Sequence, residues 1–121
     1  MVIKRLLQSF QDAARGLLFV FKNEQNFRLQ IFISILTLVA AFYFPLKNWE
    51  LILVLLLSIM VLTVELLNTA LEKLSDLLKP RLNHYVGLTK DIMAAAVFLT
   101  SLGALLIGII IFSPHFLALL D

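Results

Sequence analysis

Polar side chains lie at helical spacing at the end of a strongly apolar run, and their types suit chemistry on phosphate. Glu65, Asn68, Glu72 and Asp76 recur every three or four residues, directly after the segment LILVLLLSIMVLTV. At about 100° per residue, this spacing places them and Thr69 on one strip of a helix. Carboxylate and amide oxygens on such a strip can hold Mg²⁺ and leave positions for phosphate oxygens.

Other charged residues could complete such a site. Glu24 is a second acid at similar depth, just before the first long apolar segment. Lys90, with Arg5 or Arg28, could offset the remaining phosphate charge. Glu65 lies deepest in the apolar run, where it could take a proton from a lipid hydroxyl at the membrane interface.

Two other interpretations of the same acids stay open. An ionised carboxylate in lipid is costly unless it is paired, hydrated or bound to metal. Glu65 and Asn68 could join helices by hydrogen bonds, with Glu72 and Asp76 as a solvated helix end. The chain would then be a non-enzymatic membrane assembly subunit. An ion or proton path, as in a transport subunit, would need further acids, and we expect none in the outer half of any span.

The composition indicates an integral membrane protein. Of 121 residues, 61% are hydrophobic and only 15% are charged, which exceeds what a soluble core of this size can hide. There is no cysteine, so disulfides and thiolate metal sites are excluded. Glycine-rich nucleotide motifs of the P-loop and Rossmann types are also missing. The N-terminal residues do not form a signal peptide, because polar side chains interrupt them.

The apolar pattern predicts a single domain, residues 1–121, with four helical segments. The first is amphipathic and basic, which is typical of a helix lying in the membrane interface. Three membrane spans follow, the second continuing as helix to Leu78, with Pro45 and Pro80 ending the first two. A polar loop over 81–90 and a short tail after Ser113–Pro114 complete the expectation. The bounds are about 2–22 for the surface helix and about 29–46, 49–69 and 92–112 for the spans.

The basic residues predict the topology. Of the 10 lysines and arginines, only Lys47 lies between the first and second spans, and none follows the third. The other nine therefore share one side of the membrane. The positive-inside rule places that side in the cytoplasm, with the N-terminus inside and the C-terminus outside.

Several motifs together resemble the bacterial diacylglycerol kinase family, and specifically its undecaprenol kinase-like branch. The segment ELLNTALE, residues 65–72, is followed by Asp76, a polar segment and Lys90-Asp91 before AAAV. An amphipathic helix and the pair Asn23-Glu24 precede the first span. This order of motifs covers nearly the whole chain.

The resemblance implies an all-α integral membrane enzyme of the bacterial inner membrane. Its relatives phosphorylate a membrane lipid alcohol with Mg²⁺ and ATP, as a homotrimer whose active sites are shared between subunits. No nucleic acid is implied as a partner. Roles carried over by motif position are Glu65 as catalytic base, Glu24 and Glu72 as Mg²⁺ ligands, Asn68 at the lipid or phosphate, Lys90 at the ATP phosphates, Asp91 and Asp76 on the nucleotide side, and Arg5 near lipid or nucleotide.

Two departures bear on the acceptor lipid. Gln30 stands where many diacylglycerol kinases have glutamate, and Ala94 where they have serine. Together with the segment Glu24 to Arg28, these residues are more similar to undecaprenol kinases. We therefore expect undecaprenol, ahead of diacylglycerol, as the acceptor. We assign no role to His84.

Overall fold

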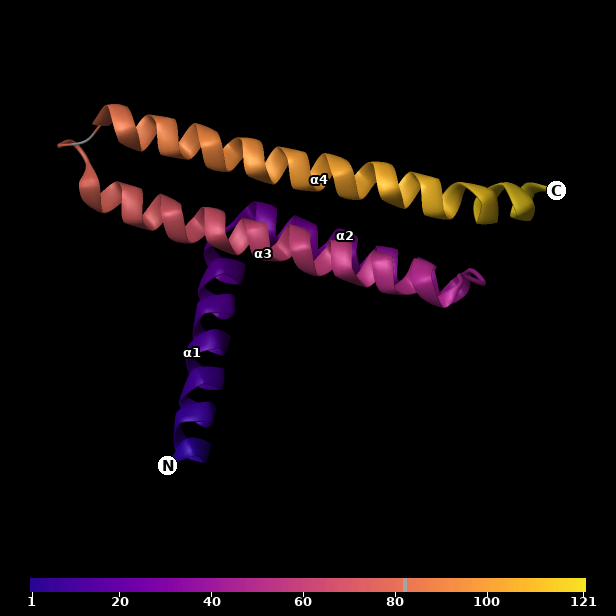
Figure 1. The fold of residues 1–121 in the computed structure, drawn as a ribbon, viewed down its shortest axis with the longest axis horizontal. Helices are drawn as coiled ribbons and strands as arrows, with labels where there is room; N and C mark the ends of the chain where they lie inside the picture. Colours follow the sequence, from indigo (N-terminus) through magenta and orange to yellow (C-terminus); the bar gives the residue numbers. More distant parts are fainter. Residues whose placement is uncertain (82) are drawn as a thin grey trace.

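Four helices make up the chain. The computed structural model describes residues 1–81 and 83–121, and in these residues it contains helices and no strand. The helices are α1 (Val2–Asn23), α2 (Gln25–Tyr43), α3 (Asn48–Leu78) and α4 (Asn83–Leu120). Figure 1 shows α2, α3 and α4 running side by side, while α1 leaves them at a steep angle. The all-α class predicted from the sequence is confirmed.

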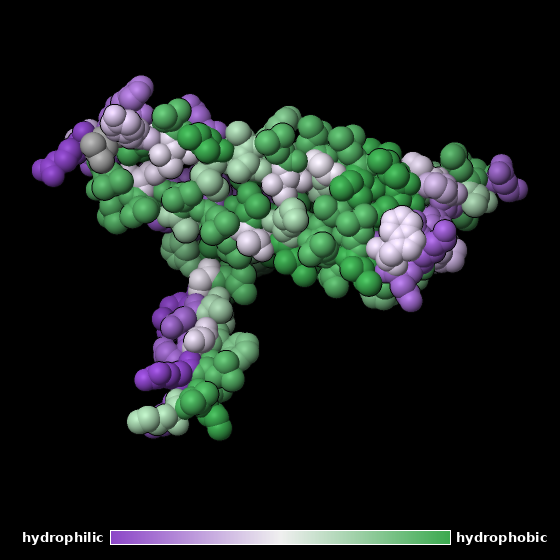
Figure 2. All heavy atoms as spheres, viewed as in Figure 1, coloured by the Kyte–Doolittle hydropathy of each residue, from purple (hydrophilic) through white to green (hydrophobic). Residues whose placement is uncertain are grey.

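Helix α1 keeps its apolar face exposed. Val20, near its C-terminal end, is its one buried residue, whereas Phe10, Leu17 and Leu18 lie open on the surface. Apolar and polar residues occupy opposite sides of this helix in Figure 2. An uncovered apolar face opposite a basic one fits a helix that lies on a membrane.

Helix α3 is the central element of the bundle. It packs against both α2 and α4, while the backbones of α2 and α4 do not approach each other closely within the described residues. A small core of Ala41, Val54 and Ile111 joins the three helices near the C-terminus of the chain. Each of these helices is long and apolar enough to cross a membrane. Apolar side chains cover most of the bundle surface in Figure 2, as expected for contact with lipid.

Some expected boundaries are wrong. The loop expected over 81–90 is shorter, because α4 already begins at Asn83 and contains Gly87. Val86 is buried, and such packing can outweigh the cost of about 1 kcal/mol for a helical glycine. The tail expected after Ser113–Pro114 is helical to Leu120, with Pro114 inside the helix. Pro45 and Pro80 do follow the ends of α2 and α3, as predicted.

The break between the first two helices is also shorter than expected. The expected bounds leave a gap between about residue 22 and about residue 29, whereas only Glu24 separates α1 from α2. Phe27, in the first turn of α2, is 2% exposed, so its burial holds this turn against the bundle. As a result, the predicted metal ligand Glu24 occupies a tight corner between two helices.

Candidate functional site

Glu65 is the most deeply buried ionisable residue that the sequence singled out. It lies on α3 with 2% of its surface exposed, although it follows a run of apolar residues. Thr69, one turn later and also buried, donates its hydroxyl to the Glu65 carbonyl at 3.1 Å. The side chain of Gln30, from α2, lies near the Glu65 carboxyl. Glu65 therefore sits between α2 and α3, away from lipid.

Two further carboxylates gather around Glu65. The charges of Glu24, at the α1–α2 corner, and Glu72, two turns along α3, both act on the Glu65 carboxyl. Both residues are half-buried, as is Asn68 on the same side of α3. Three neighbouring acids in a poorly hydrated place repel one another unless a proton or a cation offsets their charge. A bound cation is one way to offset this charge.

The donor set fits Mg²⁺ in part. Within the described residues, no group of three or more His, Asp or Glu side chains is arranged to hold a metal. Glu24 and Glu72 nevertheless supply the hard carboxylate oxygens that Mg²⁺ prefers. Because Mg²⁺ is usually bound by one or two carboxylates together with substrate phosphates and water, two such ligands are sufficient for a nucleotide-dependent site.

Lys90 and Asp76 meet beyond this cluster. Lys90 Nζ lies 3.3 Å from Asp76 Oδ1, which joins the start of α4 to the end of α3. Figure 1 shows both helices extending past the point where α1 leaves the bundle. The two side chains remain 36% and 55% exposed, so a soluble ligand can reach them. A cation is thus available next to the acidic cluster on the solvent side.

Arg5 is not brought to the cluster within one chain, and Asp91, next to Lys90 in the sequence, is exposed on α4. Arg5 is exposed near the start of α1, roughly 28 Å from Glu24 at 1.5 Å per residue. Because α1 points away from the bundle, Arg5 of the same chain lies far from Glu65. An arginine at this position could contribute to the site around Glu65 only if it came from another chain.

Sequence reasoning gave Gln30 no role beyond marking a departure from relatives. Its side-chain oxygen is buried and lacks a hydrogen-bond partner within the described residues. The sequence feature that could have indicated a role for Gln30 is its position as a polar residue inside an apolar segment. Its proximity to Glu65, however, depends on the pairing of α2 with α3, which the sequence pattern does not specify.

The expectation that no acid occurs in the outer half of a span is wrong. Glu50 lies in the first turn of α3, within the range predicted for the second span, and is 8% exposed. One of its oxygens accepts the backbone N–H of Lys47 at 2.9 Å and lies 3.5 Å from His115 Nε2. Both partners lie at the opposite end of the bundle from Glu65. Glu50 therefore caps α3 and connects it to α4, which gives it a structural role.

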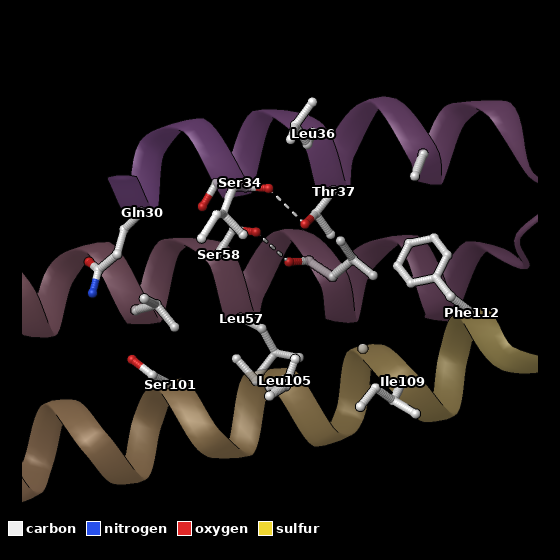
Figure 3. Close-up of a pocket in the computed structure, with 16 residues that line it drawn as sticks. Gln30, Ser34, Leu36, Thr37, Leu57, Ser58, Ser101, Leu105, Ile109 and Phe112 are labelled. Carbon is white, nitrogen blue, oxygen red and sulfur yellow. Dashed lines mark hydrogen bonds between the residues drawn. The ribbon is translucent and has the colours of Figure 1, made fainter. Parts of the chain in front are cut away.

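An apolar groove runs between α2 and α4, with α3 as its floor. Its volume is about 630 Å³, and it extends from Gln30 to Phe112 (Figure 3). The hydroxyls of Thr37 and Ser58 donate to carbonyls of their own helices, at 2.8 and 3.0 Å. These hydroxyls need no partner inside the groove, which is therefore suited to hydrocarbon or to another apolar helix.

The fold and the cluster define a helical membrane protein with a buried acidic site at one end of its bundle. Comparison with known proteins identifies its class. Residues 11–112 match the model of the prokaryotic diacylglycerol kinase family. The chain belongs to this family, as its motifs predicted, and is a bacterial membrane lipid kinase.

Curated relatives carry both expected activities in their names. A diacylglycerol kinase of Synechocystis is 33% identical over 98% of this chain and 69% of its own length. An undecaprenol kinase of Bacillus subtilis is 30% identical over 93% of this chain and 91% of its own length. A diacylglycerol kinase of Haemophilus influenzae is 30% identical over 80% of this chain and 82% of its own length. Such similar identities do not distinguish the two acceptors.

Proposed function

We propose that this lipid kinase transfers the γ-phosphate of ATP, in the presence of Mg²⁺, to the hydroxyl of a membrane alcohol beside Glu65. The observation that carries the proposal is the burial of Glu65 next to the two half-buried carboxylates of Glu24 and Glu72. An acid at this position is costly for a purely structural helix, whereas a kinase needs a base at the meeting point of lipid and nucleotide.

Glu65 acts as the general base. The lipid alcohol enters from the bilayer, and its hydroxyl proton passes to a Glu65 carboxylate oxygen as the new O–P bond forms. The bond between the γ-phosphorus and the β–γ bridging oxygen breaks at the same time, and ADP leaves. Gln30 holds the Glu65 side chain from the neighbouring helix, while Asn68 orients the lipid hydroxyl or the phosphate.

The remaining residues orient the nucleotide. Glu24 and Glu72 hold Mg²⁺, which neutralises charge on the phosphate oxygens when it is bound. Lys90 contacts the phosphates, with Asp76 and Asp91 on the nucleotide side. Phosphoryl transfer depends mainly on in-line placement of the reacting groups and on neutralisation of phosphate charge. These residues include the types that both tasks require.

The position of the site follows the proposed topology. With the N-terminus in the cytoplasm and the C-terminus outside, the end of the bundle that holds Lys90 faces the cytosol, where ATP is available. This orientation in the bacterial inner membrane is supported by the nine basic residues on one side. Lipid then reaches Glu65 from the inner leaflet.

A homotrimer with shared active sites completes the proposal. Its support is that Arg5 lies away from Glu65 in its own chain and that the groove between α2 and α4 is open. A neighbouring chain would bring α1 and its Arg5 to the site.

We propose undecaprenol ahead of diacylglycerol as acceptor, because of Gln30 and Ala94.

One assay tests the function. Purified protein in mixed micelles receives labelled ATP, Mg²⁺ and either undecaprenol or diacylglycerol, and the labelled lipid is measured. Transfer should require Mg²⁺ and be faster with undecaprenol. A folded protein that transfers phosphate to neither alcohol would refute the proposal. Liposome flux that depends on Glu65, without transfer, would favour a transport subunit instead.

A further inference from the structure

The corner between α1 and α2 is held by backbone and side-chain hydrogen bonds around one residue. Glu24, the single residue between the helices, has an extended backbone with φ −116° and ψ 110°. Its N–H donates to the Val20 carbonyl at 2.8 Å, and its carbonyl accepts the N–H of Arg28 at 3.3 Å. The direction of the Glu24 side chain is therefore set by how the two helix ends are held together.

Arg28 makes a second connection across this corner through its side chain. Its Nη1 donates to the carbonyls of Phe21 and Lys22, at 2.8 and 2.9 Å. These carbonyls belong to the last turn of α1, where a helix has no further N–H groups of its own to offer. Because Arg28 is in the first turn of α2, its guanidinium fixes the end of one helix to the start of the next.

We propose that Arg28 is a positioning residue, which holds Glu24 in place for Mg²⁺ by clamping α1 to α2. This inference rests on the proposed function, in which Glu24 is a ligand. It also gives Arg28 a different role from the phosphate-side cation considered in the sequence, because its Nη1 is directed at backbone carbonyls. A planar guanidinium suits this task, since one rigid group can serve two acceptors.

The first test measures the dependence of phosphate transfer on Mg²⁺. Arg28→Gln should raise the half-saturating Mg²⁺ concentration about tenfold, the low end of what loss of a residue supporting a metal ligand costs. Turnover at saturating Mg²⁺ should stay within about twofold of wild type, because no reacting group is removed. Arg28→Lys should be intermediate. An unchanged Mg²⁺ dependence in Arg28→Gln would overturn the inference.

Arg15→Gln is the matched control. It removes the same charge from the same predicted side of the membrane, but Arg15 is exposed and, within the described residues, its side chain pairs with Asp12 alone, at 3.4 Å. Its Mg²⁺ dependence should equal that of the wild type. If Arg15→Gln shifts the Mg²⁺ requirement as much as Arg28→Gln, general surface charge explains the effect and the clamp does not.

A double substitution tests whether Arg28 acts through Glu24. In a Glu24→Gln background, Arg28→Gln should cause no further rise in the Mg²⁺ requirement, since the ligand it positions is already lost. Independent, additive effects would overturn the inference. Failure of the proposed function gives a different result, because the wild-type protein would then transfer no phosphate.

A distance measurement tests the clamp without activity. The chain has no cysteine, so cysteines placed at the exposed Gln11 and Phe32 can carry one spin label on α1 and one on α2. Labelled chains are diluted with unlabelled ones, so that distances between chains do not contribute. Arg28→Gln should broaden the distance distribution, and Arg15→Gln should leave it as it is. An equally narrow distribution in Arg28→Gln would overturn the inference.

Discussion

Lys90 Nζ lies 3.3 Å from Asp76 Oδ1 and links the start of α4 to the end of α3. Both side chains are open to solvent, so the pair itself adds little to stability. Its value lies in placement, because it keeps a cation next to the acidic cluster of Glu24, Glu65 and Glu72. An incoming phosphate can replace the Asp76 carboxylate as the partner of Lys90.

Lys90→Met should therefore raise the KM for ATP about tenfold or more, while the KM for lipid changes little. Asp76→Asn removes the competing carboxylate but keeps the cation, so it should change the KM for ATP by less than about threefold. Steady-state kinetics with both substrates varied provide the measurement. Equal losses in the two variants would show that the ion pair, rather than the cation, is needed.

Glu65→Gln should lower turnover by about 10²–10⁴-fold, the range that general base catalysis contributes. Nucleotide binding should persist, because Glu65 is assigned no contact with the nucleotide. Glu50→Gln is the matched control, a buried acid on the same helix at the opposite end of the bundle. It should keep turnover near that of the wild type. Comparable turnover in Glu65→Gln and wild type would contradict the assignment of the base.

Glu72→Gln should raise the Mg²⁺ concentration needed for half-maximal rate by about 10–100-fold, because one of two protein ligands becomes neutral. Part of the lost rate should return at high Mg²⁺, which distinguishes this variant from Glu65→Gln. Titration of Mg²⁺ at fixed ATP measures the effect. A rate loss that no Mg²⁺ concentration relieves would argue that Glu72 has a different role.

His115→Ala should weaken the end of the bundle opposite Glu65 without affecting catalysis. The Glu50 carboxylate then loses its partner on α4 but keeps the N–H of Lys47. We expect the apparent Tm in detergent to fall by a few degrees, with an unchanged KM for ATP. His84→Ala, on the exposed start of α4, is the comparison and should not move the Tm. Equal thermal behaviour of the two variants would argue against a stabilising contact.

Topology can be tested by chemical labelling, because the chain contains no cysteine of its own. Lys4→Cys and Asp121→Cys place single thiols near the two termini. In intact cells, a reagent that does not cross the inner membrane should label the C-terminal cysteine only. Labelling of the N-terminal cysteine alone would reverse the proposed orientation, and with it the side from which ATP arrives.

The sequence was sufficient to predict the elements of the fold that depend on local pattern. Apolar runs of spanning length and the amphipathic first segment correspond to α1–α4. The loop expected over 81–90 and the tail expected after Pro114 were wrong, because packing of nearby residues such as Val86 and Ile111 outweighs local helix preference. Burial by a neighbouring helix is not encoded in a window of a few residues.

The site was predictable only where one helix carries it. Glu65, Asn68 and Glu72 share a strip of α3, so their spacing in the sequence was sufficient to group them. The contacts of Glu65 with Gln30 and of Glu50 with His115 join different helices, and the pairing of helices decides them. The roles of Arg5 and Asp91 stay predictions, because one chain leaves both residues exposed and does not bring Arg5 to the acidic cluster.

Helix α3 lies between the other two membrane helices, and within the described residues its backbone alone approaches both of them closely. The two outer members each have one flank covered, whereas the middle member has two. Both buried acids of the described residues, Glu50 and Glu65, are on this middle helix. The order of packing thus matches the helix on which a single chain withdraws carboxylates from hydrocarbon.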